Sequence, residues 1–214
     1  SFFGIQSWFH KAVAELSGGQ KQLLNLASVM VMQPSVLILD EPACQLDPIA
    51  AGEFLTMVGK INRELGTTVI LTEHRLEEAL PLATRVIVLD GGEIICDKPP
   101  EEIGAALKAL GHPMFLSMPT PMRVWAAVES GLSCPLSISE GRSWLEKYAE
   151  GHEFFPLPPE KPNVFESDTP AIELDNVWFR YGKNEPDVIK GLSFKAYSGE
   201  FMCILGGNGT GKTT

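Results

Sequence analysis

The stretch GGNGTGKTT, from Gly206 to Thr214, constrains the fold of this chain more than any other. It matches the phosphate-loop pattern G-x-x-x-x-G-K-[ST], with fixed positions at Gly206, Gly211, Lys212 and Thr213. In such a loop the glycines let backbone N–H groups approach phosphate oxygens, and the lysine supplies positive charge. The loop normally follows a core strand and opens a helix, so the pattern predicts a phosphate-binding site in an α/β fold.

Composition excludes several classes of protein. The chain has 214 residues and 44% hydrophobic content, enough for one large domain or parts of two. Its net charge of −10 and pI near 4.9 argue against a nucleic-acid binder, which would carry a basic face. Its apolar runs are of strand length, whereas a membrane helix needs about 20 apolar residues. We therefore expect no membrane span and, because no basic-then-apolar leader follows Ser1, no leader peptide.

A second candidate anion site lies near residue 17. Apolar residues recur every three or four positions between residues 23 and 31, which predicts an amphipathic helix that Pro34 ends. Ser17 is placed to cap this helix, and Gly18 and Gly19 follow it. Two interpretations stay open: an ordinary capped helix, or a helix N-terminus whose bare N–H groups bind a phosphate.

Two carboxylates follow the next apolar run. Val36 to Leu39 predict a strand buried on both faces, and Asp40 and Glu41 come directly after it. Open α/β sheets bind ligands at the carboxyl ends of their strands. In ATP hydrolysis one such acid holds Mg²⁺ and its neighbour orients or deprotonates the attacking water. The alternative is that Asp-Glu-Pro is only a turn.

A histidine follows a further predicted strand. Residues 67–72 have the same apolar character, and His74 stands at their end. A lone histidine is more often structural than catalytic. The position of His74 after a strand, like that of Asp40 and Glu41, is what makes it a catalytic candidate.

These motifs together resemble the ATP-binding cassette (ABC) ATPases. The segments LSGGQ, LILDEP, LD and a histidine resemble the signature, Walker B, D-loop and switch histidine in order and spacing. The segment TEHRLEE at residues 72–78 is similar to sequences of the energy-coupling-factor subfamily, whose cassettes drive uptake of vitamins and metal ions. The chain departs from the common pattern with Glu73 before the histidine and Arg75 after it. The segments lie at Leu16 to Gln20, Leu37 to Pro42, Leu46 to Asp47, and His74.

The resemblance implies an α/β, P-loop NTPase fold with a parallel core sheet, an antiparallel β subdomain and two partial cassettes. Residues 1–110 are expected to be the C-terminal half of a first cassette, and residues 111–169 a proline-rich linker with short helices. One helix is expected after Pro121, and another has Ser137 and Glu140 as a capping box. Residues 170–214 are expected to start a second cassette, with antiparallel strands and then a buried strand, EFMCILGG. The chain is thus expected to be a fragment of a tandem-cassette protein.

The resemblance also implies the members of a split site. ATP would lie between the phosphate loop of one cassette and the signature of the other, with Mg²⁺ as cofactor. Tyr181 would stack on adenine, although a strand-end tyrosine that only packs is the alternative. Glu41 and His74 would be catalytic, and Asp40 and Thr213 would bind the metal. The remaining residues expected at ATP are Ser17, Gly18, Gly19, Gln20, Asp47, Gly206, Gly207, Asn208, Gly209, Thr210, Gly211, Lys212, Thr213 and Thr214.

The function that the resemblance implies is ATP hydrolysis that powers import through a membrane transporter. Expected partners are a coupling protein and a substrate-binding membrane subunit, with the other cassette of the same chain, and no nucleic acid. The intact protein would be cytoplasmic and peripheral on the membrane, and the isolated fragment inactive. Two alternatives stay open: a soluble tandem-cassette factor acting on ribosomes or DNA, and an inert nucleotide-binding fragment.

Overall fold

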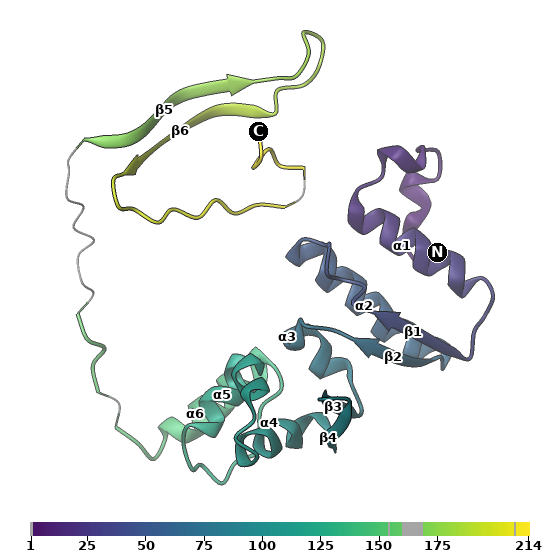
Figure 1. Ribbon diagram of the computed structural model, residues 1–214, viewed down its shortest axis with the longest axis vertical. Coiled ribbons are helices and arrows are strands. Elements are labelled where there is room, and N and C mark those ends of the chain that lie inside the picture. The colour runs from purple at the N-terminus through teal and green to yellow at the C-terminus, as the bar shows by residue number, and fades with distance from the viewer. Residues whose placement is uncertain (1, 154, 160–168, 208) are drawn as a thin grey trace. The chain divides into compact units, whose positions relative to one another are not determined.

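The computed structural model describes residues 2–153, 155–159, 169–207 and 209–214 (Figure 1). Asn208, predicted to lie in the phosphate loop, and part of the predicted linker fall outside the described residues. The chain divides into two compact units. One contains Ser1–Gln45 and Ala50–Phe155, and the other contains Leu46–Ile49 and Pro156–Thr214.

A parallel strand pair organises the first unit. β1 (Val36–Asp40) pairs with β2 (Thr68–Thr72) in register, so that Asp40 lies opposite Thr72. Helix α2 (Pro48–Leu65) connects the two strands, as a parallel connection requires, and buries one apolar face. The pairing confirms the predicted α/β class and the two predicted strands.

The expectation that residues 36–39 are buried on both faces is wrong. Leu37 is only 5% exposed, but Val36 and Ile38 are 49% and 69% exposed, and Ile70 of β2 is 52% exposed. Successive side chains of a strand point to opposite faces, so the described residues cover one face of this pair and leave the other open.

Helix α1 (Gly18–Met30) begins where the sequence predicts. The Ser17 hydroxyl accepts a hydrogen bond from the Gln20 N–H (3.3 Å), and the Gln20 side-chain oxygen accepts one from the Ser17 N–H (2.9 Å). This capping box satisfies two backbone donors at once. The helix buries Leu26, Ala27 and Met30. Two short 3₁₀ turns precede it, η1 (Ile5–Trp8) and η2 (Val13–Glu15).

An antiparallel hairpin and a helix follow β2. Short turns α3 (Leu76–Ala79) and η3 (Leu80–Leu82) lead into β3 (Val86–Asp90) and β4 (Glu93–Lys98). Gly91 (φ 57°) and Gly92 (φ 85°) form the turn between the two strands, which needs positive φ at both positions. The Arg85 guanidinium donates two hydrogen bonds to Asp97, and they hold the pKa of that carboxyl below its usual value. Helix α4 (Pro100–Ala109) then starts at a proline, which is favoured at the first helical position.

The two short helices predicted after residue 111 are both present. Turn η4 (Pro113–Ser117) precedes α5 (Thr120–Ala126), and α6 (Ile138–Ala149) follows. Ser137 caps α6 as predicted, since its hydroxyl accepts a hydrogen bond from the Glu140 N–H (3.2 Å). The Glu140 carboxylate, however, accepts from the N–H of Leu136 (2.8 Å) and not from that of Ser137, so the box is shifted by one residue.

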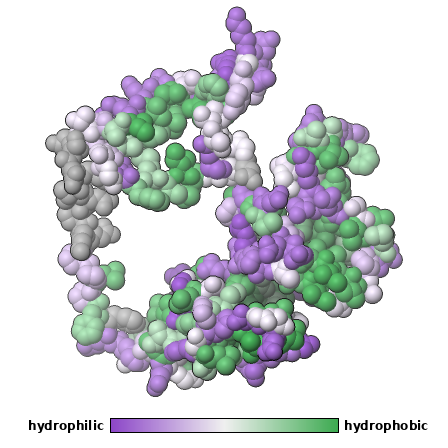
Figure 2. Space-filling model, in the orientation of Figure 1, coloured by the Kyte–Doolittle hydropathy of each residue, from purple (hydrophilic) through white to green (hydrophobic). Residues whose placement is uncertain are grey.

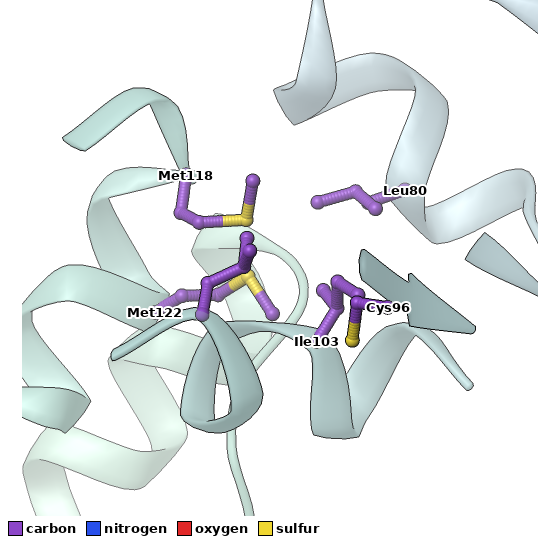
Figure 3. Packing of buried hydrophobic residues seen from close by; sticks show 6 residues of the cluster. Leu80, Cys96, Ile103, Met118 and Met122 are labelled. Carbon is purple, nitrogen blue, oxygen red and sulfur yellow. The ribbon is translucent and has the colours of Figure 1, made fainter. Parts of the chain in front are cut away.

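A small core joins these helices to the hairpin (Figure 3). Met118 and Met122, which the sequence places in the linker, share it with Ile103 of α4 and Cys96 of β4. Cys134 packs against the same cluster, and burial raises the pKa of its thiol to about 11. The buried members are Leu80, Cys96, Ile103, Leu107, Met118 and Met122.

Truncating this core should destabilise the protein strongly. Ile103 is 0% exposed, so Ile103→Ala removes buried methyl groups and leaves a cavity. We expect it to lower the free energy of unfolding by about 2–5 kcal/mol. The matched control is Ile138→Ala on α6, because Ile138 is 75% exposed and should change stability by less than about 0.5 kcal/mol. Urea unfolding of both variants measures the difference, and equal effects would contradict the assigned core.

The second unit is built on the predicted antiparallel strands, β5 (Pro170–Phe179) and β6 (Ile189–Tyr197). The predicted buried strand that should lead into the phosphate loop is not formed. Residues 201–207 have no regular structure, and Phe201 and Leu205 are 97% and 85% exposed. No strand among the described residues pairs with this segment. Figure 2 shows apolar surface around β5 and β6 of this unit.

Across the described ranges, none of the helices is both long and apolar enough to cross a membrane.

Candidate functional site

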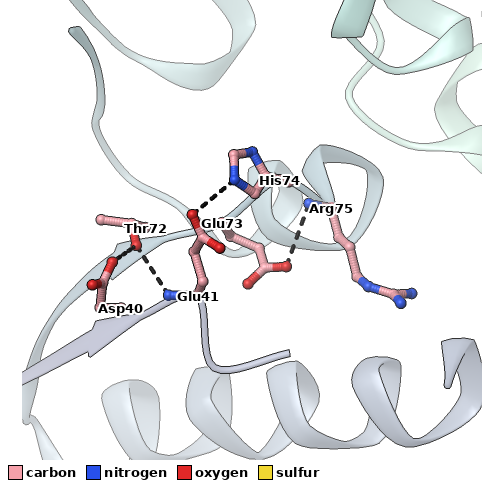
Figure 4. A network of polar contacts seen from close by, with 6 residues as sticks. All are labelled: Asp40, Glu41, Thr72, Glu73, His74 and Arg75. Carbon is pink, nitrogen blue, oxygen red and sulfur yellow. Dashed lines mark hydrogen bonds and ion pairs between the residues drawn. The ribbon is translucent and has the colours of Figure 1, made fainter. Parts of the chain in front are cut away.

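The end of the parallel strand pair gathers the predicted carboxylates and a threonine (Figure 4). Asp40 ends β1 and Thr72 ends β2, and the two residues are paired in register. The Thr72 hydroxyl donates a hydrogen bond to Asp40 Oδ1 (2.5 Å) and accepts one from the Glu41 N–H (3.0 Å). One hydroxyl therefore links the first carboxylate to the backbone of the second.

Glu41 and His74 lie in contact at this edge. The Nε2 atom of His74 is 2.8 Å from Glu41 Oε1, and the two side chains are 78% and 47% exposed, respectively. The structure thus brings together the two residues that the sequence predicted as catalytic. A carboxylate next to an imidazole, open to solvent, can accept a proton from a bound water and pass it on.

Glu41 adopts a left-handed backbone conformation, with φ of 42°. This region is uncommon for residues other than glycine, and such strain costs about 1–3 kcal/mol. The Glu41 N–H also bonds the main-chain oxygen of Thr72 (3.1 Å), so both oxygens of Thr72 hold it. The conformation turns the chain directly after β1, at the point where the Glu41 side chain reaches His74 (Figure 4).

Glu73 has an incompletely satisfied carboxylate. Its Oε1 accepts a long hydrogen bond from the Arg75 N–H (3.4 Å). Its Oε2 is buried and has no hydrogen-bond partner among the described residues. The two departures from the common cassette pattern, Glu73 and Arg75, therefore contact one another beside His74 (Figure 4).

The predicted signature residues form the first turn of α1. The capping box occupies the side chains of Ser17 and Gln20, while the N–H groups of Gly18 and Gly19 belong to the first turn, which has no intrahelical partners. A Cβ atom at Gly19 would lie 2.9 Å from the Cβ of Ala50, so glycine is required where α1 approaches α2. The turn is therefore a well-capped helix start, and both interpretations of it, structural cap and anion site, fit this geometry.

Asp47 has a local structural contact. Its carboxylate accepts a hydrogen bond from the Ile49 N–H (3.1 Å), directly before the body of α2. An aspartate in this position satisfies a free donor at a helix start. This contact is independent of any nucleotide.

The phosphate loop lies in the second unit and is held by its own contacts. The Lys212 ammonium donates to the main-chain oxygens of Gly206 (2.6 Å) and Gly207 (2.5 Å). The Thr210 hydroxyl donates to Gly207 O (2.9 Å). Gly211 has φ of 89°, and a Cβ there would come within 3.1 Å of Val188, so only glycine fits without strain. The lysine is therefore folded across two backbone oxygens of the loop.

Tyr181 reaches the phosphate loop within the same unit. Its hydroxyl lies 3.0 Å from the Thr214 hydroxyl, and its ring packs edge-on against Phe179 with centroids 5.0 Å apart. The side chain is 68% exposed, which leaves much of the ring open to solvent. The structure therefore places the predicted adenine contact next to the predicted phosphate contact. Thr213, the predicted metal ligand of the loop, is also exposed.

The predicted residues fall into two groups. Asp40, Glu41 and His74 share the first unit, and Tyr181 and the loop share the second. Among the described residues there is no cluster of three or more histidine, cysteine or acidic side chains that could hold a metal alone. Carboxylate and hydroxyl oxygens such as those of Asp40 and Thr213 nevertheless suit Mg²⁺, which takes few protein ligands and completes its shell with water and phosphate.

Sequence reasoning missed Thr72. It was counted only as the end of a strand, although its hydroxyl contacts both neighbouring acids. The available signal was a hydroxyl residue at the carboxyl end of a strand parallel to the one that carries Asp40 and Glu41. Without the strand register, that signal does not show that Thr72 lies opposite Asp40.

Comparison with known proteins finds a family match in the first part of the chain. The ABC transporter family model matches residues 2–44, which include α1 with its cap and the two acids at the end of β1, Asp40 and Glu41. Residues 2–44 therefore resemble part of an ABC transporter ATPase domain, which supports the predicted ABC class.

Longer relatives match the chain from end to end. A protein of Bacillus thuringiensis subsp. konkukian, named as an ABC transporter ATP-binding protein, is 40% identical over 218 residues, covering 100% of this chain and 38% of that protein. One of Clostridium tetani with the same name is 34% identical over 215 residues, covering 100% of this chain and 46% of its own length. The chain therefore spans less than half the length of these curated relatives.

Solved structures include similar ABC proteins. The cbiO1 protein from Clostridium perfringens, part of the ABC transporter complex cbiONQ, is 34% identical with a TM-score of 0.46, covering 51% of this chain and 44% of that chain. The ADP conformation of MJ1267, an ATP-binding cassette of an ABC transporter, is 26% identical with a TM-score of 0.46, covering 54% and 44%.

Proposed function

We propose that the intact protein containing this chain is an ATPase that powers transport through an ABC-type membrane transporter. The observation that carries the proposal is the contact between Glu41 and His74, beside the carboxylate of Asp40, at the carboxyl end of a parallel strand pair. Position, residue types and geometry all fit an acid that accepts a proton from an attacking water. The end-to-end similarity to proteins named as ABC transporter ATP-binding proteins supports the same function.

In this proposal the two groups of residues serve different nucleotides. The loop from Gly206 to Thr214 and Tyr181 would bind ATP in one site, and Asp40, Glu41 and His74 would act in a second site. The first turn of α1, from Ser17 to Gln20, and Asp47 would contact the nucleotide held by the loop. Alignment of a longer relative along the whole chain supports this order of motifs within one tandem-cassette protein.

Thr213 and Asp40 carry the oxygen atoms that a magnesium ion prefers as ligands. Thr213 would hold Mg²⁺ in the loop site, and Asp40 would hold it in the other. The ion would neutralise charge on the phosphates during hydrolysis. Lys212 would add a further positive charge at the phosphates, while Glu41 would hold and deprotonate the water with His74 fixing its carboxylate.

The finer proposal is import of the energy-coupling-factor type. It rests on the segment TEHRLEE at residues 72–78, in which Glu73 and Arg75 flank the histidine. In this proposal the first cassette ends near residue 110, residues 111–169 link the cassettes, and residues 170–214 begin the second. The partners would be a coupling protein and a substrate-binding subunit in the membrane, and the protein would sit at its cytoplasmic face.

Membrane attachment in this proposal depends on a protein partner. The chain carries a net charge of −10, and an anionic lipid surface attracts basic segments, by about 1 kcal/mol per Lys or Arg near the surface, so lipid should not hold the protein. In cell fractionation, the full-length protein should sediment with membranes only when its transmembrane partner is co-expressed. A contact that buries apolar surface should persist at high salt, because only charge contacts are screened.

Three outcomes would contradict this picture. Membrane association of the full-length protein without any partner would contradict attachment through a protein partner. Release by salt alone would indicate a purely electrostatic contact, and full-length protein that remains soluble and binds ribosomes or DNA would support the soluble factor. ATP hydrolysis by the purified full-length protein, measured in parallel, tests the enzymatic part of the proposal independently.

A further inference from the structure

We propose that Thr72 is a positioning residue of this site, whose hydroxyl holds the Asp40 carboxylate and the Glu41 backbone in one arrangement. The inference deepens the proposed function and rests on it, because it assigns Thr72 a role in ATP hydrolysis. Among the described residues the Thr72 hydroxyl bonds the two acids and makes no hydrogen bond to His74. Its effect passes through the two acids.

The hydroxyl of Thr72 uses both of its hydrogen-bonding capacities. A hydroxyl has one O–H to donate and can accept as well. Here it donates to Asp40 Oδ1 at 2.5 Å and accepts from the Glu41 N–H at 3.0 Å. The bond to the carboxylate is charge-assisted, and such bonds are shorter and stronger than neutral ones. Replacing the hydroxyl with a methyl group would therefore release the Asp40 carboxylate and remove one of the two acceptors of the Glu41 N–H.

The contact fixes the orientation of the Asp40 carboxylate. With Oδ1 held by Thr72, rotation of the carboxylate is restricted, and Oδ2 has no hydrogen bond within the described part of the chain. That oxygen is then presented in one direction, available for a water or a cation. A carboxylate with a fixed free oxygen binds Mg²⁺ at lower entropic cost than one that rotates, because the ion demands near-ideal geometry.

The contact also stabilises the unusual backbone of Glu41. The left-handed conformation at φ 42° persists only where the surroundings compensate for its strain. Two oxygens of Thr72 accept from the same N–H, the main-chain oxygen at 3.1 Å and the hydroxyl at 3.0 Å. Loss of the hydroxyl removes one of these two acceptors. The backbone can then relax and withdraw the Glu41 carboxylate from its 2.8 Å contact with His74.

A purely structural role for Thr72 predicts different behaviour. Thr72 is exposed at the last position of β2, where substitutions contribute little to packing. Valine has nearly the shape of threonine and favours strands equally, so Thr72→Val should keep β2 and remove only the hydroxyl. Serine keeps the hydroxyl and loses the methyl group. The pair therefore separates hydrogen bonding from shape.

The experiment compares Thr72→Val and Thr72→Ser in the full-length protein. We expect Thr72→Val to lower kcat for ATP hydrolysis about 10- to 100-fold, the loss typical of a hydrogen bond to a charged group, with ATP affinity within about twofold of wild type. Binding of Mn²⁺ with ATP, followed by electron paramagnetic resonance, should weaken in the same variant. Thr72→Ser should retain most of both. The matched control is Thr68→Val, the same change at the other end of β2.

A second readout needs no nucleotide. Removing the hydroxyl should accelerate hydrogen exchange of the Glu41 amide, observed by NMR in the nucleotide-free protein, while thermal unfolding shifts by no more than it does in Thr68→Val. Unchanged exchange in Thr72→Val, or equal loss of kcat in the serine and valine variants, would overturn the inference. Wild-type protein that hydrolyses no ATP would overturn the proposed function instead, and the exchange measurement would still decide whether Thr72 positions Glu41.

Discussion

Replacing Glu41 with glutamine in the full-length protein should abolish most ATP turnover at its site while ATP remains bound. Glutamine keeps the size of the side chain and can still hydrogen-bond to His74, which lies 2.8 Å away in the structure. It cannot accept a proton from water. Loss of a positioned general base typically lowers the rate by about 10²- to 10⁴-fold. Phosphate release gives the rate, and retention of labelled ATP on a filter gives the binding.

The matched control for this prediction is Glu53→Gln, the same substitution at an exposed position on α2. It should leave both turnover and binding unchanged. Full turnover in Glu41→Gln would show that Glu41 is not the base and would move that role to His74. His74→Ala then decides between them, because it removes the imidazole and leaves the carboxylate in place.

The acid and histidine cluster was predictable because it follows from a general property of parallel sheets. Both strands were recognisable as apolar runs, and the carboxyl ends of parallel strands lie at one edge. Glu41 directly after the first strand and His74 two residues after the second are then neighbours when the two strands are adjacent, as β1 and β2 are. The 2.8 Å contact between them confirms that they meet. The role of Thr72 was not predictable, because it depends on the register that sets Thr72 opposite Asp40.

Two apolar runs show where such reasoning fails. Residues 36–39 form a strand but are covered on one face, and residues 201–207 form no strand. An apolar run indicates that a segment can be buried in a sheet, but backbone hydrogen bonds need a neighbouring strand. The described residues supply β2 to the first run and no partner to the second. Hydrophobicity alone carries no information on whether a partner is present.

For the helices after residue 111, the sequence predicted where each helix starts but not what it packs against. Their starts were predictable because caps are local: Ser137 needs only the N–H three residues later. Their packing was not, since apolar residues on a short helix do not indicate which surface they contact. Met118 and Met122 join Ile103 in one core, and this long-range contact was invisible in the local pattern.

Replacing Lys212 with alanine should remove most nucleotide binding by the phosphate loop. In the structure the ammonium bonds the main-chain oxygens of Gly206 and Gly207, within the loop that would receive the phosphates. Alanine therefore removes a phosphate charge contact and also the bonds that fold the loop. We expect ATP affinity to fall by about 10- to 100-fold, which is the range for loss of a hydrogen bond to a charged group. Titration of the full-length protein with a fluorescent ATP analogue measures it.

The control is Lys195→Ala, which removes an equal charge from β6, where Lys195 pairs with Glu173 at 2.8 Å on the surface. An exposed pair of this kind contributes little, so affinity should not change.

The same variant tests the split site. In the 214-residue chain the loop and the Glu41–His74 pair belong to different proposed sites, so neither site is complete and no ATP should be hydrolysed. Phosphate release by this chain that Lys212→Ala abolishes would contradict the split arrangement, because it would show that the loop and the acids serve one nucleotide.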